Sequence, residues 1–228
     1  MKLFTKLSLE KYSKTDEILK IIDDYEKFTD FKLISHQWLK SSVIKRHIFQ
    51  EVYAPLFLNK KLKILDVGGG YSSITKYFIE NHDYTLLDIM SHDDHSEFKN
   101  LSDKLSFRWI NDDWHNHKPD ENYDLIIAND IFPNVDQRLE GFLKKYTNFS
   151  KNLNLSLTYY NNDRFYKVKR VDAEEVLFLK AWNGEMLSNT LSKFTTINEN
   201  SIFCQKSGES LFNNGRSVVS IQLPGNLI

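Results

Sequence analysis

The strongest constraint on the fold is a short apolar run that leads directly into three glycines. Residues 63–67 (Lys-Ile-Leu-Asp-Val) precede Gly68, Gly69 and Gly70. An apolar run of this length is typical of a central parallel strand that is buried on both faces. Gly68 and Gly70 lack a Cβ and can adopt positive φ, so the backbone can bend sharply and a ligand can approach it closely. The pattern therefore predicts a strand that ends in a ligand-binding turn.

A helix and a second strand are expected after the turn. In residues 72–81, Ile74, Tyr77 and Phe78 have helical spacing, and Ser72 or Ser73 stands at the start, so the helix would point its N-terminus at the ligand. Asp88 follows the next apolar run, twenty residues after Gly68. A carboxylate in this place can accept hydrogen bonds from both hydroxyls of a ribose. Turn, helix and acid together predict a nucleoside site.

Asp66 indicates which nucleoside is bound. It lies two residues before the first glycine, where a carboxylate would repel the pyrophosphate of a dinucleotide but would suit a ligand with positive charge. The dinucleotide pattern G-x-G-x-x-G also has Ser73 at its sixth position here. S-adenosylmethionine carries an ammonium and a sulfonium. These residues favour it, and an NAD(P)-dependent oxidoreductase of similar architecture is the alternative.

From about Leu62 to Tyr160 the sequence resembles the class I S-adenosylmethionine-dependent methyltransferase family. Residues 66–72 (Asp-Val-Gly-Gly-Gly-Tyr-Ser) are similar to the glycine-rich first motif of that family, with Ser72 in place of its last glycine. Asp88 matches the acid that holds the ribose hydroxyls. The resemblance implies cofactor binding by this motif and by the end of the next strand, at Asp66, Gly68, Gly69, Gly70, Asp88 and Ile89.

Two later segments extend the resemblance. Residues 111–114 match the third-strand region, which implies that Asp112, or alternatively Asp113, binds the adenine amino group while Trp114 covers the ring. Residues 123–130 resemble the fourth strand and its polar end, which implies that Asn129 contacts the cofactor and Asp130 faces the acceptor. An acceptor hydroxyl or ammonium must lose a proton, and Asp130 is the first candidate for the base. The alternative bases are loop histidines: His92, His95, His115 and His117.

The acceptor is expected above the carboxyl ends of the strands. Four residues from three segments are candidates for contact with it: His36, Trp38, Phe132 and Tyr160. Arg46 could also help to cover the cofactor; ordinary helix packing and a solvated face are the alternatives for these N-terminal residues. An insertion at about 164–195 is a candidate lid or substrate-selecting element. Its apolar residues could instead be helix core: Val176, Leu177, Leu179 and Trp182.

We expect no metal ligands. Some methyltransferases of catechols bind Mg²⁺ through an acid after the fourth strand and an acid-amide pair after the fifth. Asp130 with Asn162 and Asp163 could approximate that set, since Mg²⁺ prefers oxygen ligands, but the order departs from the usual acid-then-amide. The segments 92–95 and 115–117 also resemble ligand clusters, yet short polar loops of this kind are most often solvated.

The remaining pattern predicts a Rossmann-like, doubly wound α/β fold with a mostly parallel seven-stranded sheet. Strands are expected at 62–67, 84–88, 105–110, 123–128 and 153–160. One or two amphipathic helices are expected at 8–29 and another helix at 35–52, which Pro55 ends. Asn213-Asn214-Gly215 between 201–205 and 216–223 predicts a C-terminal antiparallel hairpin, with Cys204 as a strand residue. We divide the chain into an N-terminal helical cap (1–60) and an S-adenosylmethionine-binding domain (61–228).

Composition narrows the function. The net charge of −1 over 228 residues gives no basic field of the kind that binds nucleic acids, so nucleic acid is not an expected partner. No apolar run reaches the length of a membrane span, and the first residues lack the apolar core of a signal peptide, so we expect a soluble, cytoplasmic protein without membrane contact. The single cysteine excludes intrachain disulfides. Oligomeric state stays open, with a homodimer as one option.

The sequence therefore predicts an S-adenosylmethionine-dependent methyltransferase that acts on an O or N atom of a small-molecule or sugar-type metabolite, with natural-product and surface-polysaccharide tailoring as candidate roles. Residues 129–132 (Asn-Asp-Ile-Phe) stand where enzymes that methylate base or glutamine amino groups carry Asn-Pro-Pro-Tyr or Asp-Pro-Pro-Tyr. That departure argues against such substrates. The oxidoreductase and a non-catalytic nucleoside-binding protein are the alternatives.

Overall fold

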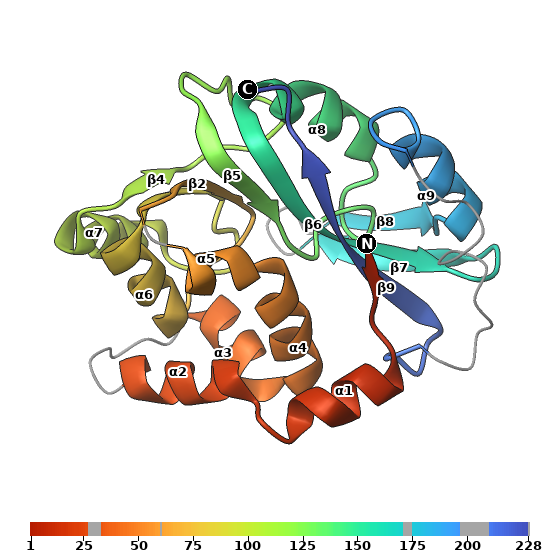
Figure 1. Cartoon of the computed structure of the whole chain (residues 1–228), viewed down its shortest axis with the longest axis horizontal. Coiled ribbons are helices and arrows are strands. Elements are labelled where there is room, and N and C mark those ends of the chain that lie inside the picture. Colours follow the sequence, from red (N-terminus) through yellow and green to blue (C-terminus); the bar gives the residue numbers. More distant parts are fainter. Residues whose placement is uncertain (27–32, 60, 171–174, 197–209, 228) are drawn as a thin grey trace.

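The described residues form a seven-stranded sheet with helices on both faces (Figure 1) and a separate two-stranded sheet. The computed structural model describes residues 1–26, 33–59, 61–170, 175–196 and 210–227. The strands of the sheet are β1 (Lys2–Leu3), β2 (Lys63–Val67), β3 (Asp83–Leu87), β4 (Arg108–Ile110), β5 (Tyr123–Ala128), β6 (Ser150–Tyr160) and β9 (Arg216–Pro224). Their order is β1-β9-β6-β5-β2-β3-β4, with β2 to β6 parallel and β9 antiparallel to both neighbours. The predicted Rossmann-like architecture is confirmed.

Side chains of the central strands alternate between two cores, because successive residues of a strand point to opposite faces. Ile64 packs into the core on one face and Leu65 into the core on the other. The first core is covered by α1 (Lys6–Ser13), α2 (Glu17–Glu26), α3 (Ile34–Ser41), α4 (Val43–Val52), α5 (Ala54–Leu58), α6 (Ser73–Asn81) and α7 (His95–Leu105). The second is covered by α8 (Leu139–Tyr146) and α9 (Gly184–Leu191), with the short 3-10 turn η1 (Thr147–Phe149) after α8.

The N-terminal helices are more divided than the sequence predicts. The single helix expected at 35–52 is wrong, because Ser42 is extended and its hydroxyl accepts a hydrogen bond from the Lys45 amide (3.3 Å), which caps α4. Pro55 does not end that helix but lies in the first turn of α5. The segment predicted as one or two helices at 8–29 contains α1 and α2, and Arg46 joins them to α4 by binding the Asp16 carboxylate at 2.8 Å.

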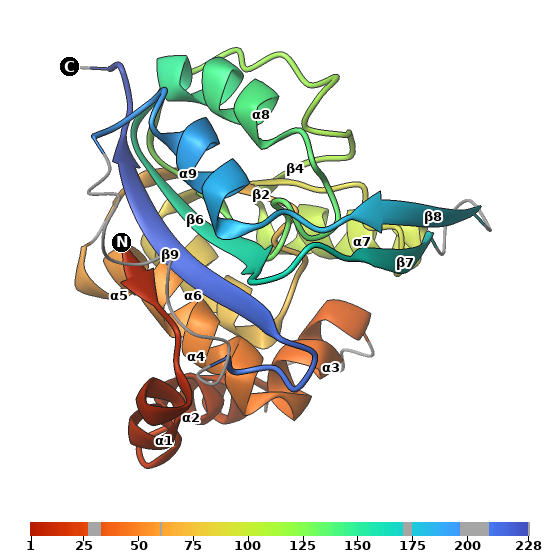
Figure 2. The same ribbon diagram turned by 90° about the vertical axis from the view of Figure 1, so that its right-hand side faces the viewer.

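The insertion after β6 is a hairpin followed by a helix. Strands β7 (Phe165–Arg170) and β8 (Glu175–Lys180) pair antiparallel, and Figure 2 shows them extending away from the main sheet. The alternative assignment of Val176, Leu177 and Leu179 to a helix core is therefore wrong. Trp182, which follows β8, packs partly buried against the second core.

The C-terminal strand β9 agrees with the predicted strand at 216–223. It pairs with β6 from Asn152 to Tyr160. Its other edge is covered by β1, where Lys2 is paired with Ser220 and Leu3 with Val219. The strand predicted at 201–205, and Cys204 within it, lie outside the described residues. Among the helices that the structure describes, none is long and apolar enough to cross a membrane.

Candidate functional site

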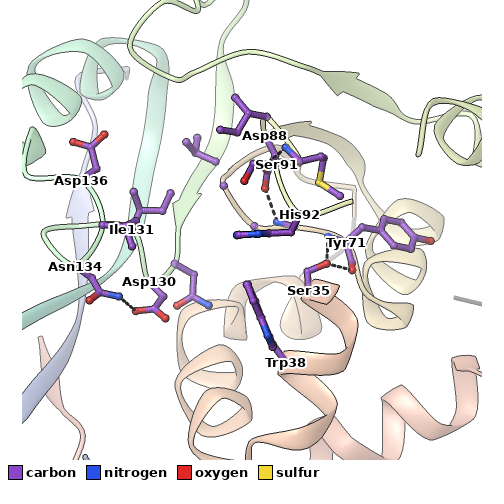
Figure 3. A pocket seen from close by; sticks show the side chains of 18 of the residues that line it. Ser35, Trp38, Tyr71, Asp88, Ser91, His92, Asp130, Ile131, Asn134 and Asp136 are labelled. Atoms are coloured by element: carbon purple, nitrogen blue, oxygen red, sulfur yellow. Dashed lines mark hydrogen bonds between the residues drawn. The ribbon is translucent and has the colours of Figure 1, made fainter. Parts of the chain in front are cut away.

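A cavity of about 630 Å³ opens at the carboxyl ends of β2, β3 and β5 (Figure 3). Its walls come from the glycine turn at 68–72, from residues 87–93 after β3 and from residues 112–114 after β4. Segments 129–131 and 134–136 after β5 form another wall, and parts of α3 and α4 close the cavity from the N-terminal side. Carboxyl ends of parallel strands are the usual ligand site of an open α/β sheet.

The glycine turn has no room for side chains. Gly68 and Gly70 have φ of +62° and +63°, and a Cβ would lie 2.6 Å from Ile131 Cδ1 and 2.6 Å from Ser35 Cβ, respectively. A Cβ on Gly69 would overlap the carboxylate of Asp66. Packing against neighbouring side chains therefore requires glycine at these positions, and the turn lines the cavity with backbone that carries no side chains.

Asp88 faces the cavity beside this turn. Its Oδ2 accepts a hydrogen bond from the Gly70 amide (2.9 Å) and its Oδ1 from the Met90 amide (2.8 Å). Each carboxylate oxygen can accept a second bond, so two acceptor positions remain for a ligand. Burial raises the pKa of Asp88, and the two amides oppose that rise. Ile89 follows on the cavity wall.

Asp66 lies beneath the turn and does not line the cavity, which corrects the expectation that it faces the positive charge of a ligand. Asp66 is 2% exposed, and its carboxylate accepts hydrogen bonds from the hydroxyls of Tyr53 (2.9 Å) and Tyr84 (2.6 Å). Burial raises the pKa of Asp66 to about 7, although both tyrosines lower it, and nearby Asp88 raises it further. Asp66 supports the turn from below.

Asp112, Asp113 and Trp114 also line the cavity, and their contacts differ. Asp112 Oδ1 accepts a hydrogen bond from the Asp113 amide at 2.8 Å. Asp113 accepts one from the His115 amide (2.7 Å) and lies 3.4 Å from Arg138. Asp112 therefore has fewer interactions than Asp113 and keeps more acceptor positions free for a ligand.

Trp114 is held firmly in the cavity wall. Its Nε1 donates to Asp136 at 2.9 Å, and Arg138 lies over its ring at 4.8 Å. The ring also packs edge-to-face against Phe132 and Phe142 in the second core. A flat side chain fixed in this way can cover one side of a ligand ring.

Asn129 and Asp130 directly follow β5. Ser156 ties both to β6, because its hydroxyl donates to Asn129 Oδ1 (2.7 Å) and accepts from the Asp130 amide (2.8 Å). Asp130 has φ of +59°, and its Oδ1 accepts from Asn134 at 3.1 Å and lies 3.8 Å from Arg216 Nη1. A non-glycine residue at positive φ is uncommon and often marks a functional position.

Of the four residues predicted to contact substrate, Trp38 lies on the cavity wall and three do not. His36 is buried between Glu26 and the Ser73 amide, whose N–H lies 3.3 Å from His36 Nδ1. Phe132 is fully buried in the second core, and Tyr160 is buried under the guanidinium of Arg164. For the apolar Phe132 ring, burial in the core is more favourable than exposure to a hydrated cavity.

Trp38 is 44% exposed and meets the ring of His92 edge-to-face at 5.0 Å between centroids. Figure 3 shows these two rings next to one another, Trp38 from α3 and His92 from the loop after β3. Arg46, the other residue proposed to cover the cofactor, instead binds Asp16 and backbone carbonyls of α3.

Sequence reasoning missed Ser35. Its hydroxyl donates to the Tyr71 carbonyl (2.5 Å) and accepts from the Tyr71 amide (3.1 Å), so α3 is attached to the glycine turn. The Ile34 amide also donates to Asp93 after β3 at 3.0 Å. A lone serine in a helix carries no recognisable signal, because only the packing of α3 brings it to the turn.

No candidate metal centre emerges from the described part of the chain, where no three His, Cys, Asp or Glu side chains are grouped so as to hold an ion. Asp130 lines the cavity, whereas Asn162 and Asp163 are exposed and lie outside its lining. The two histidine-containing segments, 92–95 and 115–117, contribute to no such group. Asp94 instead caps α7 by accepting from the amides of Ser96 and Glu97, both at 2.9 Å.

No family model and no curated protein matches the chain. Solved structures do match its fold. The N-methyltransferase NodS from Bradyrhizobium japonicum WM9, in complex with S-adenosyl-L-homocysteine, is 10% identical with a TM-score of 0.51 over 91% of this chain and 99% of that one. The magnesium protoporphyrin IX methyltransferase ChlM from Synechocystis PCC 6803, with bound SAM, is 12% identical with a TM-score of 0.50 over 91% and 97%. The chain thus has the fold of class I S-adenosylmethionine-dependent methyltransferases.

Proposed function

We propose that the protein is an S-adenosylmethionine-dependent methyltransferase that acts on an O or N atom of a small-molecule or sugar-type metabolite. One observation carries the proposal. The Gly70 amide, in the turn after β2, is hydrogen-bonded to the Asp88 carboxylate after β3, so the turn and the acid form one wall of one cavity. The class I methyltransferase fold, found also in NodS and ChlM, supports it.

The residues present suit the cofactor. The glycine turn lines the cavity with backbone that carries no side chains of its own, and Asp88 keeps two acceptor positions for ribose hydroxyls. We assign Ile89 and Trp114 to the adenine ring and the free oxygen of Asp112 to its amino group, with Asp113 as the alternative. Asn129 at the end of β5 completes the set.

When bound, S-adenosylmethionine supplies an activated methyl group. Most of the catalysis then comes from the cavity itself, which aligns the acceptor and excludes water. Asp130 is the proposed base. It lies at the end of β5, lines the cavity, and would take the proton that the acceptor O–H or N–H loses as its new bond to carbon forms.

The size and surroundings of the cavity favour a small acceptor. A volume of about 630 Å³ lies within the range of small-molecule and cofactor sites. Trp38 and His92 lie opposite the β5 wall and would cover the acceptor. With a net charge of −1, nucleic acid is not a proposed partner.

Calorimetry tests the proposal. S-adenosylmethionine, S-adenosylhomocysteine and NADH are titrated separately into protein that has been stripped of copurified ligands. We expect micromolar affinity for the two sulfur-containing nucleosides and no heat from NADH. Binding of NADH without binding of the other two would replace the methyltransferase proposal with an oxidoreductase.

A further inference from the structure

Arg216 is a cavity residue that lies far from the glycine turn in the sequence. It begins β9, and because β9 runs antiparallel to β6, Arg216 is paired with Tyr160 at the carboxyl end of β6. Its side chain is only 15% exposed, and its guanidinium lies over the ring of Phe212 at 3.8 Å. The charged group is therefore held against the cavity wall instead of extending into solvent.

The guanidinium keeps unused hydrogen-bond donors. Its Nε is buried and has no hydrogen-bond partner within the described residues. The nearest acid is Asp130, whose Oδ1 lies 3.8 Å from Arg216 Nη1, which is beyond hydrogen-bond distance. That same oxygen already accepts from Asn134. A buried donor without a partner is costly, and native proteins keep such groups mainly where something else completes them.

Positive charge on the described cavity wall comes from two side chains with permanent charge, Lys45 and Arg216. The Lys45 ammonium lies over the ring of Trp38 at 4.8 Å, on the side formed by α3 and α4. Arg216 instead lies next to the proposed base Asp130, with Nη1 3.8 Å from its Oδ1. An acceptor oriented for methyl transfer near Asp130 would therefore meet Arg216.

We propose that Arg216 binds an oxyanion, a carboxylate or a phosphate, carried by the acceptor. This inference rests on the proposed function and names the class of its acceptor: a small anionic molecule whose methylated O or N lies close to its negative group. The planar guanidinium presents a fork of donors that matches two oxygens of such a group. A purely structural role would have Arg216 serve only as a long-range charge partner of Asp130.

NMR of the full chain, with and without S-adenosylhomocysteine, separates the two roles. The Nε–H signal of Arg216 is identified by its loss in Arg216→Lys. Benzoate, phenyl phosphate and the neutral analogue benzamide are then titrated. We expect a saturable shift of this signal with at least one anion and an at least tenfold weaker response to benzamide. The anion that binds more tightly shows whether the acceptor carries a carboxylate or a phosphate. No saturable shift with either anion, or an equal response to benzamide, overturns the proposal.

Arg164 provides a matched control. Its guanidinium lies over the ring of Tyr160 at 4.9 Å and donates to the Asn214 carbonyl, outside the cavity lining. In these variants the affinity for the anion is measured from the Trp38 indole signal. Arg216→Gln should lower this affinity at least tenfold, and Arg164→Gln should lower it by less than twofold. Equal losses in both variants contradict the assignment. Failure of the unmodified protein to bind S-adenosylhomocysteine would reject the proposed function, while the titration without that ligand would still decide the role of Arg216.

Discussion

Asp66 and Asp88 lie on either side of one glycine turn, and their hydrogen bonds give them different tasks. Asp88 is held by two backbone amides and keeps its free lone pairs toward the cavity. Asp66 accepts hydrogen bonds from two tyrosine hydroxyls in the interior. Asp66 lies in one predicted strand and Asp88 ends the next, so the sequence places both acids correctly along the chain. Only the packing of Tyr53 and Tyr84 shows that Asp66 is turned away from the ligand.

Replacement of Asp88 tests its place in the site. Asp88→Ala removes the acceptor for the ribose hydroxyls, so S-adenosylhomocysteine should bind more weakly by about 1 to 3 kcal/mol. Calorimetry measures the change. Asp94→Ala is the control, because Asp94 caps α7 outside the cavity lining and its loss should affect stability without affecting affinity. Unchanged affinity in Asp88→Ala would remove this residue from the site.

Asp66 should make stability depend on pH. Its pKa is about 7 in the folded protein, above the ordinary value of 3.8, so the folded state binds the extra proton between about pH 4 and pH 7. Stability is therefore lost as the pH rises through this window, by at most about 1.4 kcal/mol per pH unit. Asp66→Asn should flatten that fall. Urea unfolding at pH 5, 6 and 7 measures it, and equal pH dependence in both proteins would contradict the assignment.

At the scale of elements, the site depends on how α3 meets the turn between β2 and α6. The turn itself is predictable, because an apolar strand followed by glycines and a capping serine is a local pattern. The position of α3 is not predictable in this way. The break at Ser42 involves neither proline nor glycine, and the contact of Ser35 with Tyr71 joins residues 36 positions apart.

The glycine turn should tolerate no side chain at Gly70. Gly70→Ala places a Cβ at positive φ and 2.6 Å from Ser35 Cβ. Gly215 is a matched control, since its φ is +80° and a Cβ there meets no atom within 4 Å. Backbone strain of about 1–2 kcal/mol applies to both variants, so Gly70→Ala should be the less stable by at least about 1 kcal/mol. It should also lose affinity for S-adenosylhomocysteine, whereas Gly215→Ala should not; equal behaviour of the two variants would contradict the close contact.

The attachment of α3 can be tested by removing one hydroxyl. Ser35→Ala breaks both hydrogen bonds to Tyr71, which should lower the free energy of unfolding by about 1–2 kcal/mol and weaken S-adenosylhomocysteine binding. Ser41→Ala, at the exposed end of the same helix, makes only a 3.4 Å contact with the Trp38 carbonyl and should change neither. Denaturant unfolding and calorimetry measure both effects. Identical results for the two serines would show that Ser35 does not hold the turn.

For the whole molecule, the sequence predicts the central sheet well because each buried parallel strand is an apolar run bounded by turn residues. Its edges are harder to predict. Strand β1 has two residues and becomes a strand only by pairing with β9, more than 200 positions away. Arg216 reaches the cavity for a similar reason, since the antiparallel direction of β9 brings its first residue to the end of β6. Such non-local pairing leaves no local pattern.

The most direct test of the account is a crystal structure of the protein with S-adenosylhomocysteine. We predict that the nucleoside lies in the cavity at the carboxyl ends of β2, β3 and β5, with its ribose hydroxyls on Asp88 and its adenine between Ile89 and Trp114. Asp66 should remain beneath the turn without touching the ligand. A nucleoside bound elsewhere, or bound with its ribose away from Asp88, would contradict the central claim.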